Sequence, residues 1–366
     1  MSNNKQAALT KYDSNMRPNG SAGEEFVWHS PLAQPFQIAG LAWFHAEGKY
    51  RRMPSQSEIM LPEAVNFLAD HPAGGQIRFQ TDSASLSIRV KLKEAANMPH
   101  MPATGQCGVD CYIGPPGEME FCNTTKYETH LTEYESVMFK DWSPAMRNVV
   151  LNLPLYQGVV ELWIGLEKGS SIIAPSAYAS NKKVIVYGTS ITQGGCATRP
   201  GMAYTNILSR RIPLEFINLG FSGSGKGEPE VAEVISQIEE PACLVLDYEA
   251  NCVSTELFQK TLPEFIRIYR TVHPKTPILV VSRIRYSREN MTPHLIEARL
   301  ERKQFQQSLV AELRNNGDEH IFFFDGSVLL GKEDFHECTV DGSHPTDLGF
   351  LRMAEGLEPV FKTLLL

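Results

Sequence analysis

Apolar and polar residues alternate along parts of the first half of the chain. The clearest example is residues 85–93, where polar positions separate Leu86, Ile88, Val90 and Leu92. This period of two is typical of a strand with one face in water. Residues 149–155 and 159–166 are a second pair of strand-like runs, joined by a short turn at 156–158. Helical periodicity is scarce and Pro and Gly are frequent, so this half predicts an antiparallel β-sandwich or jelly roll.

Beyond residue 181, strand-like and helix-like patterns alternate. The predicted strands are residues 183–187, 215–219, 243–248, 278–282 and 321–325. The predicted helices are residues 228–240, 257–272 and 295–315. Apolar residues in 228–240 recur at helical spacing and form one stripe. This alternation predicts a parallel sheet with helices on both faces, a three-layer α/β/α fold.

The change of pattern places a domain boundary in the Ser-, Ala- and Pro-rich segment 169–181. We expect a loosely held polar segment in residues 1–25, because chain ends without apolar residues have little to pack against. After this segment we expect a β-sandwich accessory domain in residues 26–178 and a catalytic domain in residues 179–366. Two domains suit a chain of 366 residues.

Charge and composition exclude some classes of partner. The net charge of −8 argues against a nucleic-acid ligand, because neutralising phosphates requires a basic face. No run of 18 apolar residues is present, and residues 1–25 lack the apolar core of a secretory signal. We therefore expect no membrane partner and a cytoplasmic location. The composition allows a homo-oligomer and does not determine one.

The seven cysteines are an odd number, which favours reduced thiols in a chain without a secretory signal. Two groups are spaced closely enough to suggest zinc ligands: Cys107, Cys111 and Cys122, and His336, Cys338 and His344. The first lacks the paired C-x-x-C spacing of a zinc site. In the second, a carboxylate partner explains His344 better. The sequence therefore predicts no metal and no cofactor.

Residues suited to chemistry follow four of the predicted strands. Ser190 follows the first strand, the glycine-rich segment 218–223 the second, and Asn251 the third. Residues 341–344, which contain Asp341 and His344, come after the fifth. The carboxyl ends of parallel strands share one edge of the sheet, so these groups can converge. A hydroxyl, free backbone amides, a side-chain amide and an Asp/His pair are the groups that acyl transfer requires.

Asp341 precedes His344 by three residues, so one turn of chain can bring its carboxylate to Nδ1 of the imidazole. Nε2 is then free to face Ser190. The pattern is not the G-x-S-x-G nucleophile elbow, because residue 192 is Thr.

Together the four blocks, residues 188–192, residues 218–223, Asn251 and the Asp341/His344 pair, resemble those of the SGNH (GDSL-like) hydrolases. The resemblance covers about residues 180–350 and implies a flavodoxin-like catalytic domain. By position it implies that Ser190 is the nucleophile, His344 the base and Asp341 its orienting acid. It also implies an oxyanion hole formed by the Ser190 amide, the Gly223 amide and the Asn251 side chain. Gly220 is a rival for the glycine position, although Gly223 fits the family spacing better.

Two positions depart from the family pattern. Thr189 replaces the usual Asp before the serine, which puts only the local turn geometry in question. Cys252 replaces the usual Asp after the block-three Asn and leaves the amide donor intact.

A second resemblance lies in the first half. Residues 108–112 are similar to the Gly-x-Asp-Leu-Tyr motif of a β-sandwich fused to one SGNH subgroup, with Cys111 in place of Leu. That subgroup implies carbohydrate esterases and related acyl-processing enzymes, and hence a small-molecule or saccharide ester as substrate. Six residues are candidates for lining the substrate pocket: Thr189, Arg199, Glu249, Arg283, Asp110 and Tyr112. For Asp110 and Tyr112 a structural role is the stronger interpretation.

Alternative functions remain at this stage. The same triad serves an acyltransferase, in which an alcohol replaces water. A non-catalytic carbohydrate-binding protein is a further alternative. Residues 220–226 also match the G-x-x-x-x-G-K phosphate loop, but Gly227 stands where a metal-binding Ser or Thr is required. Asn251 has an alternative role as the cap of the next helix.

Overall fold

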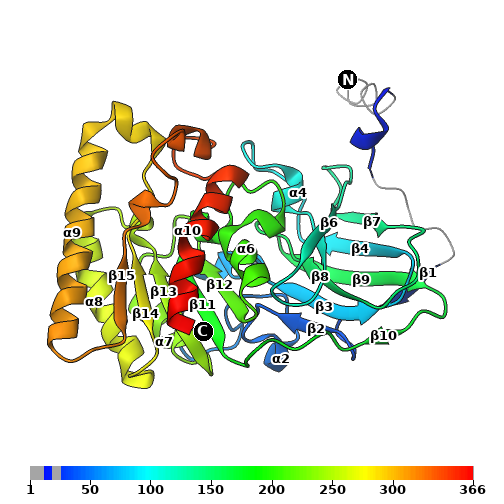
Figure 1. Cartoon of the computed structure of the whole chain (residues 1–366), viewed down its shortest axis with the longest axis horizontal. Helices are drawn as coiled ribbons and strands as arrows, with labels where there is room; N and C mark the ends of the chain where they lie inside the picture. The colour runs from blue at the N-terminus through cyan, green and yellow to red at the C-terminus, as the bar shows by residue number, and fades with distance from the viewer. Residues whose placement is uncertain (1–11, 19–25, 366) are drawn as a thin grey trace.

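The computed structural model describes residues 12–18 and 26–365 of the chain. Figure 1 shows two halves side by side, with antiparallel strands at one end of the molecule and a helix-covered sheet at the other. Of the segment 1–25, which we expect to be loosely held, only residues 12–18 are described. They contain the 3-10 helix η1 (Ser14–Met16), and Lys126 Nζ donates a hydrogen bond to the Asn15 carbonyl at 3.2 Å. The rest of that prediction lies outside the described residues.

Two antiparallel sheets form the N-terminal half. The first has the strand order β1 (Phe26–His29), β9 (Val159–Glu167), β4 (Leu86–Leu92) and β7 (Glu133–Phe139). The second has the order β10 (Ile172–Ile173), β3 (Gln76–Thr81), β8 (Arg147–Asn152), β5 (Asp110–Ile113) and β6 (Glu120–Thr124), with β2 (Gln37–Ala39) paired to β3. Apolar side chains of both sheets, such as Ile88 and Leu151, meet in one buried cluster. The predicted β-sandwich is confirmed.

The two strand-like runs 149–155 and 159–166 both contain strands, but these strands do not pair with each other across the turn. The strand β8 pairs with β3 and β5, whereas β9 pairs with β1 and β4 in the other sheet. The segment between them crosses from one sheet to the other, and two of its amides bond to the short helix α4 (Ala103–Gln106) instead of to a neighbouring strand. Leu155 N and Tyr156 N, for example, donate to the carbonyls of Gly105 and Gln106. Both strands are apolar because each faces the same core from opposite sides.

A five-stranded parallel sheet forms the C-terminal half. Its order is β12 (Glu215–Gly220), β11 (Lys183–Gly188), β13 (Pro241–Asp247), β14 (Ile278–Val281) and β15 (Ile321–Phe324). All five predicted strands are present, and the order is that of flavodoxin-like folds. On β11, Val184 and Val186 face one cluster of apolar side chains while Ile185 and Tyr187 face another. The sheet is therefore buried on both faces, as predicted.

Helices cover both faces of this sheet (Figure 1). The helices α6 (Tyr204–Arg211) and α10 (Asp347–Leu365) pack on the face of Val184, and α7 (Pro229–Ile235), α8 (Thr255–Val272) and α9 (Pro293–Asn315) pack on the other. Shorter helices are α2 (Phe44–Glu47), α3 (Glu63–Leu68), α4 (Ala103–Gln106), α5 (Ser190–Gln193), η3 (Pro200–Met202), η4 (Glu249–Asn251), η5 (Ser287–Met291), η6 (Gly326–Val328) and η7 (Phe335–Cys338). The helix predicted at 228–240 ends earlier, at Ile235.

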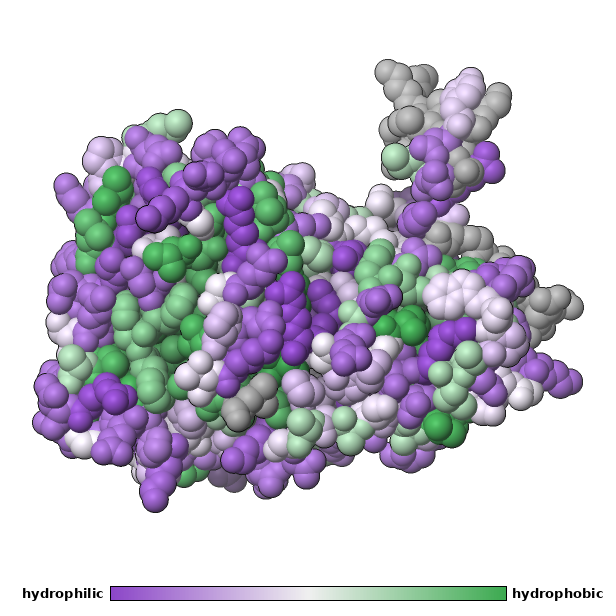
Figure 2. Space-filling model, viewed as in Figure 1, coloured by the Kyte–Doolittle hydropathy of each residue, from purple (hydrophilic) through white to green (hydrophobic). Residues whose placement is uncertain are grey.

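The surface in this view is mostly hydrophilic, and apolar patches are visible between α9 and α10 (Figure 2). Among the described residues, every helix is too short or too polar to cross a bilayer.

The two halves share a core. Met53, Val65 and Leu68 come from the N-terminal half but pack among the side chains of the parallel sheet and its helices. Beside them the fully buried Arg52 donates to the carbonyls of His71 and Leu68 at 2.6 and 2.8 Å. It also donates to the carbonyls of Asn218 and Gly220 at the end of β12. Burial lowers the pKa of Arg52 to about 9, so the guanidinium stays charged at neutral pH.

We expect Arg52→Met to lower the free energy of unfolding by about 3 kcal/mol, because it leaves several buried carbonyls without their charged donor. Chemical denaturation followed by tryptophan fluorescence would measure this change. Lys91→Met is the matched control, since Lys91 is half-exposed and its ion pair with Glu161 is long, at 4.0 Å. Equal stabilities of the two variants would contradict the role given to Arg52.

Candidate active site

Ser190 follows the end of β11 and begins the short helix α5. The turn is fixed by Thr189, whose hydroxyl accepts a hydrogen bond from the amide of Ile191 at 3.2 Å. Thr192 completes the capping box by accepting from the Thr189 amide. Thr189 is buried and its side chain is used in capping α5, so its place in a substrate pocket stays a prediction. Because β11 lies between β12 and β13, Ser190 stands where the strand order reverses, the usual place for a ligand in such sheets.

His344 links Ser190 to Asp341. Nε2 of His344 lies 2.8 Å from the Ser190 hydroxyl, and Nδ1 lies 2.7 Å from a carboxylate oxygen of Asp341. His344 and Asp341 stand in the loop just before α10. The structure therefore brings Ser190 together with Asp341 and His344, which follow it by about 150 positions in the sequence, as the strand-end argument predicts. A hydroxyl, an imidazole and a carboxylate in this order can transfer a proton away from the hydroxyl.

Hydrogen bonds hold the Asp341 carboxylate in its charged form. Partial burial alone raises its pKa, but the amides of His344 and Ser343 donate to the carboxylate at 2.8 and 3.0 Å. With the imidazole contact, these bonds lower the pKa of Asp341 to about 2. The carboxylate is consequently ionised at neutral pH, which suits a group that orients an imidazole.

Residues 221–227 contain one backbone N–H that donates to no described protein atom. Among the described residues, every amide from 221 to 227 except that of Gly223 donates to a protein oxygen. Gly223 has a φ of +65°, and no atom lies within 4 Å of the position where a side chain would begin. The amide of Gly220, the alternative residue for the oxyanion glycine, already donates to Asn218 Oδ1 at 2.9 Å. The open donor is therefore the amide of Gly223.

The same hydrogen bonds argue against a phosphate loop at 220–226. Such a loop presents successive free amides to the phosphates. Here the amides of Lys226 and Gly227 already donate to Glu228 and to the Tyr187 hydroxyl, both at 2.9 Å.

Asn251 lies in η4, after β13. One N–H of its side chain donates to the carbonyl of Phe221 at 2.9 Å, which ties Asn251 to the loop that carries Gly223. The alternative that Asn251 caps the next helix is wrong, because Ser254 caps α8 through a bond from the Leu257 amide. The second N–H of the Asn251 side chain and the Ser190 amide have no acceptor among the described residues.

Three of the predicted pocket residues lie at the seam between the two halves. The Asp110 carboxylate is fully buried and accepts from Arg199 at 2.9 Å and from the Gly201 amide at 2.7 Å. Arg199 also donates to the Tyr112 hydroxyl. The Gly-x-Asp-x-Tyr motif thus joins the sandwich to η3. These contacts give no support to a substrate role for Asp110, Tyr112 or Arg199.

Glu249 and Arg283 belong to a buried polar network. Glu249 accepts from the Arg283 amide at 2.9 Å and from Gln306 at 2.8 Å. Arg283 pairs with Glu289 at 2.6 Å. Burial raises the pKa of Glu249 even though these donors oppose the shift. Both side chains are directed to protein partners, so their place in a substrate pocket stays a prediction.

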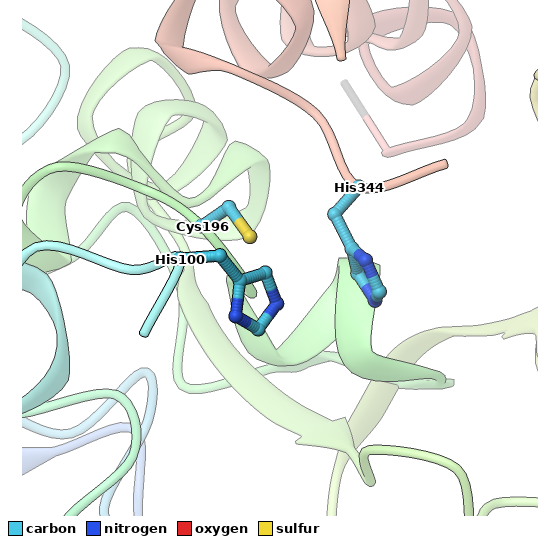
Figure 3. Close-up of side chains that lie close together, drawn as sticks. All are labelled: His100, Cys196 and His344. Atoms are coloured by element: carbon cyan, nitrogen blue, oxygen red, sulfur yellow. The ribbon is translucent and has the colours of Figure 1, made fainter. Parts of the chain in front are cut away.

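Two further residues, His100 and Cys196, lie beside His344 without any signal for this in the sequence pattern (Figure 3). His100 belongs to the loop before α4 in the N-terminal half, and its ring centroid lies 6.0 Å from that of His344. Cys196 follows α5 and is buried. Burial and the Asp341 carboxylate raise the pKa of Cys196 to about 11, so this thiol is not a competing nucleophile at neutral pH. Among the described residues, His100, Cys196 and His344 form the one cluster suited to hold a metal ion.

Tyr156 also reaches the site from the N-terminal half. Its hydroxyl donates to the Ser190 carbonyl at 3.2 Å. A side chain at Gly195 would lie 2.9 Å from this hydroxyl and 3.3 Å from the His344 ring. The close approach of these groups explains why glycine occupies that position.

Comparisons with known proteins identify the family. Residues 181–362 match the model of the GDSL-like lipase/acylhydrolase family, and residues 26–172 match that of the N-terminus of SGNH-hydrolase-type esterases. A GDSL-like lipase from Bacteroides ovatus is 30% identical, with 93% of this chain and 98% of the other covered and a TM-score of 0.84. The chain belongs to the GDSL-like lipase/acylhydrolase family. No match was found among curated proteins.

Two further structures share the fold of this GDSL-like hydrolase. A salicylyl-acyltransferase from a tetracycline biosynthetic pathway is 20% identical, with a TM-score of 0.75. A family two carbohydrate esterase from Cellvibrio japonicus is 12% identical, with a TM-score of 0.59. In both comparisons 93% of this chain and 98% of the other are covered.

The Asp341 carboxyl should titrate at about pH 2, below its ordinary value of 3.8. Because the folded-state pKa is lowered, its contribution to stability is present above the ordinary value and is lost as pH falls toward 2. A carboxyl ¹³C NMR titration, assigned with Asp341→Asn, would measure this pKa. In His344→Ala the value should move back toward 3.8. An unchanged value would show that the imidazole does not act on Asp341.

Proposed function

We propose that this GDSL-like hydrolase is a serine esterase that works through an acyl-enzyme intermediate. The observation that carries the proposal is the continuous contact from Ser190 through His344 to Asp341, at 2.8 and 2.7 Å. Each step of the reaction uses groups of the chain itself, and we propose that no cofactor is required.

The first step forms the acyl-enzyme. The Ser190 oxygen attacks the ester carbonyl while Nε2 of His344 takes the hydroxyl proton. Asp341 stabilises the imidazolium that results. As the tetrahedral intermediate collapses, the C–O bond to the alcohol breaks and His344 returns the proton to the leaving oxygen.

The second step hydrolyses the acyl-enzyme. Water activated by His344 attacks the acyl carbon, and the acid and Ser190 are released.

Three donors are proposed to bind the oxyanion: the Ser190 amide, the Gly223 amide and the free N–H of the Asn251 side chain. Their support is that no described protein group accepts from them. The bond from Asn251 to Phe221 and the fixed turn at Gly223 orient two of these donors before the substrate arrives. Donors that are already oriented stabilise developing charge without the cost of reorganisation.

We propose a short acyl group, such as acetyl on a saccharide, as the substrate. The support is the fold shared with family two carbohydrate esterases and with an acetyl xylan esterase from Butyrivibrio proteoclasticus, which is 12% identical with a TM-score of 0.56. Acyltransfer is the second candidate, because the salicylyl-acyltransferase matches over the same share of the chain with a higher TM-score. The two functions differ only in whether water or an alcohol attacks the acyl-enzyme.

A reducing compartment such as the cytoplasm is also proposed. All seven cysteines are free thiols and six of them are buried, which suits a protein that does not depend on disulfides. A homo-oligomer stays a possibility that the composition allows, and the absence of nucleic-acid and membrane partners stays a prediction.

Ser190→Ala should lower the hydrolysis of p-nitrophenyl acetate at least about 1,000-fold, because the nucleophile is lost. His344→Ala should cause a similar loss. A fluorophosphonate probe should label the wild type at Ser190 and leave Ser190→Ala unlabelled. Retained turnover in Ser190→Ala would overturn the proposal and favour a binding protein. Faster acyl-enzyme breakdown on adding a saccharide alcohol, with the transferred ester as product, would identify the acyltransferase.

Asn251→Ala should lower kcat about 100-fold with little change in KM, because the amide acts on the charge of the intermediate. Ser254→Ala is the matched control on the same loop. It removes the cap of α8 and should cost about 1 kcal/mol of stability while leaving kcat near the wild-type value. If both variants lose the same share of kcat, loop disorder rather than oxyanion binding explains the effect of Asn251.

A further inference from the structure

His100, Cys196 and His344 converge from three separate segments of the chain. Each offers one ligand atom, and these atoms all lie within 4.8 Å of one another. In Figure 3 the Cys196 thiol and the His100 ring stand on one side of a common space and the His344 ring on the other. His100 comes from the N-terminal half, so the cluster forms only when the two halves are packed together.

The chemistry and spacing of this cluster suit Zn²⁺. Imidazole nitrogen and thiolate sulfur are the ligands that zinc prefers, and three protein ligands leave a fourth position for water. Bond lengths of about 2.0–2.3 Å put ligand atoms in a tetrahedral site about 3.5 Å apart. The observed spacing requires a closure of about 1 Å, which the exposed His100 side chain can supply.

The backbone at Cys196 is a second, independent observation. Cys196 has a φ of +74°, a left-handed conformation that residues other than Gly, Asn and Asp rarely adopt. The turn is fixed by a bond from the Ala197 amide to the Gly194 carbonyl at 3.1 Å. Such strained residues gather at functional sites. Here the strain holds the thiol beside the histidine of the triad.

We propose that His100, Cys196 and His344 form an inhibitory Zn²⁺ site. Both ring nitrogens of His344 are in use, Nε2 with Ser190 and Nδ1 with Asp341. A metal on either nitrogen therefore removes one contact of the proton relay and stops His344 from acting as a base. The Cys196 thiol releases its proton to the solvent when it binds the ion. Zn²⁺ is thus an inhibitor of this protein and not a cofactor.

The site and its effect on catalysis are tested separately, because only the effect rests on the proposed function. The reduced full-length protein, freed of reductant and chelators, is titrated with Co²⁺ as a spectroscopic substitute for zinc. Wild type and the inactive Ser190→Ala should both show a thiolate-to-cobalt charge-transfer band in the near ultraviolet. Cys196→Ser should lose the band, and competition with Zn²⁺ should abolish it in the wild type. Absence of the band in the wild type would overturn the proposed site.

The inhibition is measured as the ratio of ester hydrolysis with and without Zn²⁺ in each variant, so that differences in basal activity cancel. We expect the Zn²⁺ concentration for half-inhibition to rise at least about tenfold in His100→Ala and in Cys196→Ser, because each loses a ligand. Zn²⁺ should also protect Ser190 from the fluorophosphonate probe in the wild type.

His336→Ala and Cys122→Ser are the matched controls. His336 is exposed in the segment before His344, and Cys122 is a half-buried thiol of the sandwich. Both should keep the Zn²⁺ sensitivity of the wild type. Equal sensitivity of His100→Ala, Cys196→Ser and wild type would overturn the proposal. A cobalt band without any inhibition would show a metal site that does not disable His344, which would overturn its inhibitory role alone.

Discussion

The position of β11 between β12 and β13 is the constraint on which the site depends. Gly188, the last residue of β11, is in register with Gly220 on one side and with Asp247 on the other. The segments that follow these three strands therefore leave the sheet at the same level, and they carry Ser190, Gly223 and Asn251. Because the register is set by buried apolar residues on both faces of the sheet, it leaves little freedom to shift. The site therefore inherits its geometry from the core.

Much of the C-terminal half could be predicted from the sequence. Its strands are short apolar runs that end abruptly, and the parallel arrangement follows from the helical stretches between them. Ser190, Asn251 and the Asp341/His344 pair were identifiable because each stands directly after such a run or within one turn of its partner. From the sequence, only the family resemblance favours Gly223 over Gly220 as the oxyanion glycine. In the structure the Gly220 amide already donates to a side chain, whereas the Gly223 amide has no acceptor among the described residues.

Other features are not encoded in local pattern. Two apolar runs joined by a short turn show the same sequence pattern whether they pair with each other or face one core from two sheets. Residues 149–155 and 159–166 lie in two different sheets that face one core. Charge at a strand end does not show what a side chain binds: Glu249 and Arg283 have buried partners elsewhere in the chain, which the local pattern does not indicate. His100 stands far from His344 in the sequence, and only the packing of the two halves brings the two rings together.

The bonds of Arg52 to the end of β12 also bear on how the chain folds during synthesis. The Arg52 guanidinium and its acceptor at Asn218 are 166 residues apart. At the usual rate of translation, roughly 10 to 30 seconds pass before the acceptor emerges after the donor. Until then Met53, Val65 and Leu68 lack the sheet against which they pack. The N-terminal half is thus made first but completes its packing late, and these apolar side chains stay uncovered until the sheet has been synthesised.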